Sequence, residues 1–257
     1  MDILTQHNSP DVIAAKTAAV CAAMLANSIH IKQPNFERIG VDDLDHMFGL
    51  YDGLFFEGWL RTAVKAKTSH PLTFRLSSTM TRAGGKIIQH RRGPSAADCR
   101  YEIAIASRML FMTFGNIRRP VTIGGLTCDD RLSALQRILE HEIIHLAELL
   151  AWGQTSCSGP RFRKLALSIF GHTGTTHTLV TVHEHAATEH GIHLGDMVTF
   201  EIEGRRLIGR VNRIHRRATV LVRDADGRPY SDGFKYRTFY VPLAMLGSVE
   251  MGERQSG

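Results

Sequence analysis

Residues 137–152 read R-I-L-E-H-E-I-I-H-L-A-E-L-L-A-W, and this stretch decides the fold. It lies inside a longer pattern, residues 130–151, whose leucines recur at helical spacing and which Gly153 follows as a stop signal. The leucines of this stripe are Leu132, Leu135, Leu139, Leu146 and Leu149. The flanks of the two histidines are apolar enough to bury most of such a helix. The sequence therefore predicts a long, largely buried helix over 130–151.

The centre of this helix carries the pattern H-E-x-x-H, formed by His141, Glu142 and His145. Histidines four residues apart lie one above the other on a helix, so both imidazoles can converge on one metal ion. Zinc lowers the pKa of a bound water towards about 7, and the glutamate can then remove its proton. The same pattern also arises by chance, with histidines on a surface or hydrogen-bonded in a core. Because polar groups on an apolar helix need partners, we predict zinc ligands at His141 and His145 and a general base at Glu142.

Segments on both sides of this helix predict a mixed α+β fold. Strands are expected over residues 72–79, 86–90 and 100–106, from their alternation and β-branched content. Gly84-Gly85, between the first two strands, predicts a hairpin at that point. Further helices are predicted from apolar spacing and from proline and glycine at their ends. These helices cover residues 10–30, residues 42–56 and the segment between Gly159-Pro160 and Gly171.

The texture of the chain changes after His190, where short alternating segments replace helical patterns. Turns are expected at Glu203-Gly204 and Asp226-Gly227. Short strands at this spacing favour a small closed β-barrel of about 55 residues. The predicted strands cover residues 196–203, 206–214, 217–223 and 236–242.

From about Leu44 to Thr178 the sequence resembles the SprT-like family, which includes the Spartan proteases of DNA–protein crosslinks. The resemblance rests on several segments in the family's order and not on the zinc motif alone. These are FFEGWL (residues 55–60), LTFRLSSTMTRAGGKI (72–87), YEIAIASRML (101–110), HEIIHLAELL (141–150), SGPRF (158–162) and Thr176-His177. The resemblance implies a small zincin-type metalloprotease domain in which the active helix lies beside a β-sheet.

One departure from the family concerns the third zinc ligand. The family has a histidine in its His-Gly-x-x-Phe element, where this chain has Ser158. Catalytic zinc normally takes three protein ligands and a water, and a serine hydroxyl is a poor ligand. The candidates for the third position are His172, His177, Cys157 and Glu148. His172 and His177 are the first choices, and at most one of them is expected to bind the metal.

The C-terminal segment is a second departure, because it has no four-cysteine zinc ribbon of the kind that some SprT-like proteins carry. It is similar to SH3-like or KOW-like barrels, which bind nucleic acids, peptides or neighbouring domains. Arginines crowd this segment between Arg205 and Arg217. The predicted organisation is an N-terminal helical extension over 1–40, a metalloprotease domain over 41–185 and a barrel over 191–250.

The functional prediction is a zinc metalloprotease of SprT-like type that acts on DNA-associated or DNA-crosslinked proteins. The net charge of +6 and pI near 9.3 favour a DNA or RNA partner, bound through the basic surface and the barrel. The alternatives are a non-catalytic, zinc-containing nucleic-acid-binding protein on a zincin fold and a metal-dependent hydrolase of another substrate. No P-loop, dinucleotide fingerprint or G-x-S-x-G motif is present.

The remaining composition indicates the compartment. The four cysteines form no C-x-x-C pair, which argues against a disulfide framework and fits a reducing environment. The N-terminus lacks a signal-peptide pattern, and no run of about 18 apolar residues appears. We therefore expect a cytoplasmic protein without a membrane span.

Overall fold

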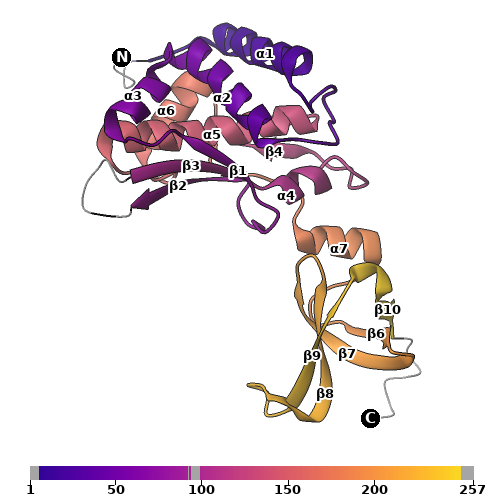
Figure 1. The fold of residues 1–257 in the computed structure, drawn as a ribbon. Coiled ribbons are helices and arrows are strands. Elements are labelled where there is room, and N and C mark those ends of the chain that lie inside the picture. Colours follow the sequence, from indigo (N-terminus) through magenta and orange to yellow (C-terminus); the bar gives the residue numbers. More distant parts are fainter. Residues whose placement is uncertain (1–5, 92, 94–98, 250–257) are drawn as a thin grey trace. The chain divides into compact units, whose positions relative to one another are not determined.

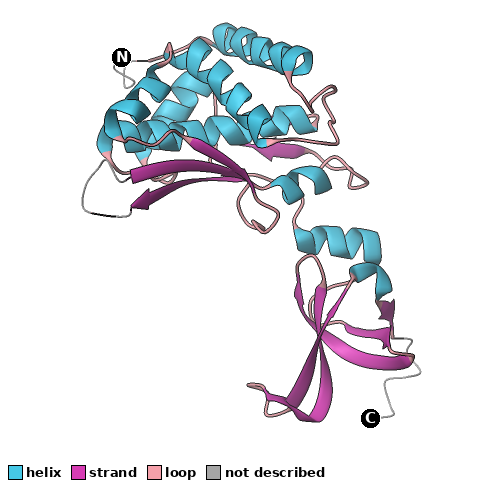
Figure 2. Ribbon diagram, in the orientation of Figure 1, coloured by secondary structure: helices cyan, strands magenta, loops and turns pink. Residues whose placement is uncertain are grey.

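The computed structural model describes residues 6–91, 93 and 99–249. Residues 1–5, 92, 94–98 and 250 of the predicted domains therefore lie outside the described residues. The chain divides into two compact units, Met1–Leu179 and Val180–Gly257. Helices and strands both contribute (Figure 2), so the predicted α+β class is confirmed. Within the described residues, no helix combines the length and the apolar character needed to cross a membrane.

Helices are the main secondary structure of the first unit (Figure 1). The three helices predicted from spacing and end signals are confirmed within a few residues. The long helix begins at Asp130, whose side chain accepts a hydrogen bond from the Ser133 amide, and ends at Gly153, where φ is 73°. Two short helices, α3 and α4, were not predicted. The helices are α1 (Pro10–Asn27), α2 (Val41–Phe56), α3 (Trp59–Lys67), α4 (Ser107–Met112), α5 (Arg131–Trp152) and α6 (Pro160–Phe170).

A three-stranded sheet lies beneath these helices, with strand order β1-β3-β2 (Figure 1). Its strands are β1 (Thr73–Leu76), β2 (Gly85–Arg91) and β3 (Cys99–Ile105). Strand β3 pairs in parallel with β1 and antiparallel with β2. The hairpin predicted at Gly84-Gly85 is therefore wrong, because β1 and β2 do not pair. The buried side chains of β3 place it at the centre, and neither glycine has the positive φ that a tight hairpin turn requires.

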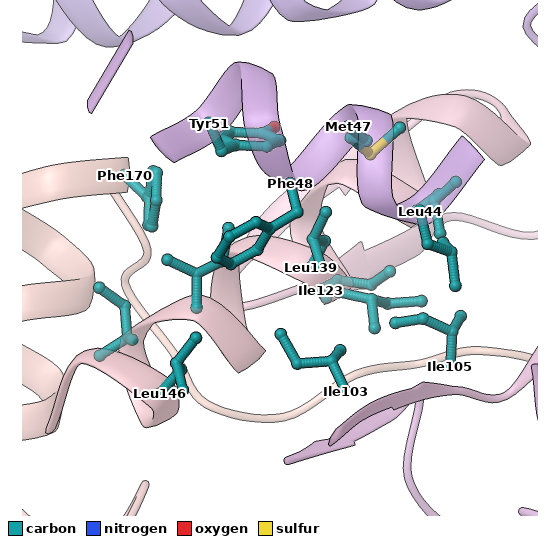
Figure 3. Close-up of a cluster of buried hydrophobic side chains, with 14 of the residues drawn as sticks. Leu44, Met47, Phe48, Tyr51, Ile103, Ile105, Ile123, Leu139, Leu146 and Phe170 are labelled. Carbon is teal, nitrogen blue, oxygen red and sulfur yellow. The ribbon is translucent and has the colours of Figure 1, made fainter. Parts of the chain in front are cut away.

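The core of this unit forms where α2 and α5 pack over β3. Figure 3 shows side chains of the three elements in contact across this layer. Apolar residues of α1 belong to the same buried cluster, so α1 packs into this core. The residues labelled in the figure from these three elements are Leu44, Met47, Phe48, Tyr51, Ile103, Ile105, Leu139 and Leu146.

A two-stranded hairpin, β4 (Val121–Ile123) and β5 (Leu126–Cys128), lies before α5. Its turn residues Gly124 and Gly125 have φ of 61° and 79°, a conformation that glycine adopts without steric cost. Strand β4 also forms a bridge with His177, which brings the chain after α6 back towards α5.

The second unit contains a five-stranded antiparallel sheet with order β10-β6-β7-β8-β9. Its four longer strands overlap the four that the sequence predicted. The described pairings join them into a sheet, whereas the prediction was a closed barrel. The elements are α7 (Val182–His190), β6 (Met197–Ile202), β7 (Arg205–Ile214), β8 (Ala218–Pro229), β9 (Lys235–Val241), a short 3-10 helix (Leu243–Met245) and β10 (Gly247–Ser248). A separate apolar cluster supports this unit, including Phe200, Val211 and Val220.

Candidate metal centre

Two nitrogens from adjacent turns of α5 face each other. Nε2 of His141 lies 3.2 Å from Nε2 of His145. Two nitrogens that are each about 2.0–2.1 Å from one tetrahedral zinc ion would be about 3.3 Å apart. Both rings pack against Phe162 of α6, at centroid distances of 4.8 and 4.4 Å. This apolar contact holds the two rings in an arrangement that suits a shared metal ion.

A chain of hydrogen bonds sets the orientation of His145. Its Nδ1 lies 2.5 Å from Oγ1 of Thr155, and that hydroxyl donates to Oε2 of Glu148 at 2.6 Å. Arg161 donates to the other oxygen of Glu148 at 2.8 Å. Because the threonine hydroxyl has one proton, which goes to Glu148, the hydrogen bond from His145 must be donated by its Nδ1–H. The lone pair of His145 is then on Nε2, which faces His141.

Burial lowers the pKa of both histidines. Burial, together with His145, His172 and His177, lowers the pKa of His141 to about 3. Burial also lowers the pKa of His145 to about 4, although Glu148 acts in the opposite direction. Both imidazoles are therefore neutral near pH 7, the form in which histidine binds a metal.

The thiol of Cys157 is the third group at this place. Its Sγ and one ring nitrogen each from His141 and His145 all lie within 4.8 Å of one another. Two imidazoles and a thiol at this spacing could hold a metal ion. Ser158, at the position of the family's histidine, instead lies with its hydroxyl 2.9 Å from Oγ of Ser156.

His177, a predicted candidate for the third ligand, lies in the same cavity through its bridge to Ile123. Its ring already has partners. Nδ1 accepts a hydrogen bond from the Leu179 amide at 3.3 Å, and the ring also bonds to the Arg82 backbone. Burial lowers the pKa of His177, against the effect of that backbone contact. The ring is thus a neutral part of the cavity wall, and its Nδ1 is already used by the Leu179 amide.

His172, the other first-choice candidate, lies apart from the cavity. The chain turns at Gly171, the end of α6, and buries the His172 ring in the core. Its Nε2 is 2.7 Å from Oε2 of Glu140. The structure therefore brings His141, His145, His177 and Cys157 to one cavity and places His172 with Glu140.

Glu142 is the carboxylate of this cavity, and only 4% of it is exposed. Burial raises the pKa of Glu142 to about 8, while a hydrogen bond from the Ile87 amide of β2 acts in the opposite direction. Gly85 makes this contact possible. A Cβ at Gly85 would lie 2.7 Å from Cγ of Glu142, closer than side chains tolerate.

A cavity of about 560 Å³ opens over these groups. Strand β2, an edge strand of its sheet, forms one wall, and β4 and the segment before His177 form another. The residues that line the cavity include Arg82, Gly85, Lys86, Ile87, Thr155 and His177. The volume lies within the range of small-molecule and peptide side-chain pockets.

Sequence reasoning missed two of these residues. Thr155 had no signal, because a threonine two residues after a helix end is an ordinary loop residue. Gly85 had a signal that was misread, since a Gly-Gly pair indicates close backbone approach as well as a turn. Cys157 was weighed only as an alternative, although its place beside the expected ligand position was a usable signal.

Comparisons with known proteins found no matching family model, curated protein or solved structure. The function has to be argued from the geometry of the site, as fold alone would not decide it in any case.

Proposed function

We propose that this chain is a zinc-dependent peptide hydrolase with a zincin-type fold, as its resemblance to the SprT-like family implies. The observation that carries the proposal is the meeting of two neutral imidazoles, His141 and His145, beside the buried carboxylate of Glu142 in one cavity. A purely structural histidine pair needs no buried acid beside it, and burial without a cationic partner raises the pKa of this acid to about 8.

The donor set favours zinc over the commoner hard cations. Imidazole nitrogen and cysteine sulfur suit zinc, whereas magnesium and calcium prefer oxygen ligands. The hydrogen bond from His145 to Thr155 supports this assignment, because metal-binding histidines usually donate their second N–H to a fixed acceptor.

The chemistry follows from the position of Glu142. Zinc would supply Lewis acidity, lowering the pKa of water and polarising a carbonyl. Without metal, the raised pKa of about 8 leaves Glu142 mostly protonated near pH 7, and a neighbouring cation would favour its ionised form. The ionised group accepts one amide hydrogen bond, from Ile87, which leaves acceptor capacity for a water proton. It can then return this proton to the departing amine, so that the same side chain acts as base and as acid. His177, on the opposite wall, is placed to contact the substrate.

The edge position of β2 favours a peptide as the substrate. An extended peptide can bind beside an edge strand through main-chain hydrogen bonds, with side chains alternating between the cavity and solvent. Gly85, Lys86 and Ile87 bring this edge directly to Glu142. A scissile bond carried by an added strand would therefore pass the catalytic carboxylate.

The test is hydrolysis of an unfolded protein such as casein by the full chain, as purified, after chelation and after zinc is restored. We expect about one zinc per chain, loss of hydrolysis on chelation and recovery with zinc. His145→Ala should lose both zinc and hydrolysis. Stoichiometric zinc without hydrolysis, with and without DNA present, would contradict the peptidase and favour a non-catalytic protein.

A second proposal concerns nucleic acid and rests on one end of the second unit, which we compare to SH3-like or KOW-like barrels. Arg213 pairs in register with Thr219, which pairs with Tyr240 on the next strand, so the three side chains share one face. Tyr240 is 68% exposed. Arg216 and Arg217 form the adjoining turn, and no ion pair of these three arginines is found among the described residues. Exposed arginines around an aromatic ring suit a phosphate backbone and a stacked base.

This surface is tested by oligonucleotide binding to the full chain over a range of salt concentrations. Replacing Arg213, Arg216 and Arg217 by alanine should weaken binding and reduce the log–log salt slope by about 0.7 per lost single-strand contact. Arg210→Ala is the matched control, because this arginine already pairs with Asp232 at 3.2 Å. Unchanged binding by the triple variant would exclude this surface. If the triple variant binds more weakly as expected, proteins bound to DNA or RNA are the expected substrates.

A further inference from the structure

We propose that Cys157 is the third protein ligand of the metal, as a thiolate in place of the histidine that SprT-like proteins have at the position of Ser158. The proposal rests on the proposed zinc site but concerns a ligand, not the reaction. It assigns the metal two imidazoles and one thiolate, a mixture of the nitrogen and sulfur ligands that zinc takes in proteins.

The first argument is that the other candidates are engaged elsewhere. His172 is buried against Glu140 at 2.7 Å. His177 uses its ring for the Leu179 amide and the Arg82 backbone. Glu148 holds Thr155 and Arg161 with its two oxygens, at 2.6 and 2.8 Å. Cys157 is the one remaining candidate whose donor atom lies with those of the two histidines.

The distances between the three donor atoms also favour Cys157. A sulfur about 2.3 Å and a nitrogen about 2.0 Å from one tetrahedral zinc ion would be about 3.5 Å apart. Sγ of Cys157 and the nitrogens of His141 and His145 already lie within 4.8 Å of one another. A side-chain adjustment of about an ångström would close the shell, well within the reach of a rotamer change at a half-buried cysteine.

The third argument is the path of the loop between α5 and α6. Thr155 and Cys157 both line the cavity, whereas Ser156 and Ser158 contact each other. Thr155 is fixed from two sides, by His145 and by Glu148. Because Thr155 is fixed in this way, the side chain of Cys157, two residues later, faces the same cavity. The ligand is thus displaced by one residue from the family's position, and the alternation of the loop decides which residue points inward.

Metal binding requires that the thiol lose its proton. The S–H bond breaks, the sulfur lone pair forms the bond to the metal and the proton leaves to solvent. The thiolate brings one negative charge to two neutral imidazoles, which compensates for the absent third histidine.

The test replaces zinc with cobalt(II) in the full chain and records its absorption spectrum. A thiolate ligand gives a sulfur-to-cobalt charge-transfer band in the near ultraviolet, which imidazole and water do not give. Cys157→Ser should abolish this band and weaken zinc binding by at least about 100-fold, since even residues that only orient ligands cost 10–100-fold. Cys157→His should restore zinc affinity without the band. Cys21→Ser, a half-buried free cysteine of α1, is the matched control and should keep both.

The outcomes separate this inference from the proposed function. Cobalt binding without the band in the wild type would overturn Cys157 as a ligand, even if hydrolysis is found. The band in the wild type and its loss in Cys157→Ser would support the ligand, even if no hydrolysis is found. An unchanged zinc affinity in Cys157→Ser, with the circular dichroism spectrum preserved, would also overturn the assignment.

Discussion

Helix α5 buries two carboxylates two residues apart, and the structure surrounds them in opposite ways. Glu140 accepts hydrogen bonds from Tyr51 at 2.7 Å and from Arg137 at 2.9 Å, and it lies 2.7 Å from His172. Burial alone would raise the pKa of Glu140, but His172, Arg137 and Tyr51 outweigh it and lower the pKa. Glu142, on the cavity side, has the Ile87 amide, and burial raises its pKa to about 8.

The difference separates a structural group from a chemical one. A carboxylate whose oxygens are all paired cannot take up a further proton without losing a partner. A buried carboxylate with spare acceptor capacity is a costly feature that packing alone does not explain. Glu140 therefore orders the core, and Glu142 is available to the cavity.

The largest expected effect is on hydrolysis. Glu142→Gln removes the proton acceptor but neither ligand, so the rate should fall by roughly 100- to 10,000-fold. Zinc content and the urea midpoint should stay close to those of the wild type, because glutamine has nearly the shape of glutamate and neither zinc ligand is changed. Rates measured on the zinc-loaded chain provide the check. A variant that remains active would remove Glu142 from the mechanism.

Glu140→Gln should give the opposite result. It leaves Arg137, whose side chain is 19% exposed, without its anionic partner, and breaking such a buried pair costs about 3–5 kcal/mol. Urea unfolding would measure this loss. Folded variant protein should keep the wild-type rate per bound zinc. If Glu140→Gln were stable and inactive, the division of roles between the two carboxylates would be reversed.

Gly85→Ala tests whether β2 and Glu142 are matched to each other. The added methyl group would meet Cγ and Oε1 of Glu142 at 2.7 and 2.8 Å, so the carboxylate or the strand must move. We expect a loss of about 1–3 kcal/mol in unfolding free energy and a reduced rate. Gly53→Ala is the control, since a Cβ there meets nothing within 4 Å and should stabilise α2 by about 0.5–1 kcal/mol. Full activity in Gly85→Ala would show that the close approach has no catalytic role.

The smallest effect concerns Asp43 of α2, a buried carboxylate remote from the cavity. Burial opposes its ionisation, but hydrogen bonds from Ser28, Gly40 and His30 outweigh this and lower its pKa. A lowered folded-state pKa contributes stability above the unfolded value near 3.9, and this contribution disappears as pH falls through the folded value. Asp43→Asn should lose about 1 kcal/mol at neutral pH. Its urea midpoint should fall less steeply between about pH 5 and 2 than that of the wild type. If the urea midpoints of the variant and the wild type fell in parallel with pH, the hydrogen bonds to Asp43 would not determine how stability responds to acid.

The sequence predicted what local signals encode. Helix α5 and the facing pair of His141 and His145 could be predicted because spacing within one helix fixes which residues share a face. The two Gly-Gly pairs show the limit of this approach. Gly124-Gly125 forms a hairpin turn with positive φ, whereas Gly84-Gly85 makes room for Glu142, more than fifty residues away in the chain.

The sequence named Cys157 as a candidate for the third group of the site but could not select it. Whether Cys157 or Ser158 faces the cavity depends on how Thr155 is held between His145 and Glu148. This is a tertiary arrangement with no periodic signature in the loop. His172 was predicted as a candidate ligand because it is an additional histidine after the motif. Its contact with Glu140 depends on where α6 ends.

The paired surroundings of Glu140 also determine the rotational phase of α5. Successive residues of an α-helix are turned by about 100°, so Glu140, His141 and Glu142 point in three different directions. Tyr51 of α2 and His172, which follows α6, hold the first of these directions from outside the helix. Because the helix is rigid, this also fixes the directions of His141 and Glu142. A slip of one residue would bring an imidazole to the Ile87 amide and a carboxylate to Phe162. The contacts of Glu140 with Tyr51 and His172 thus keep His141 and Glu142 directed at the cavity.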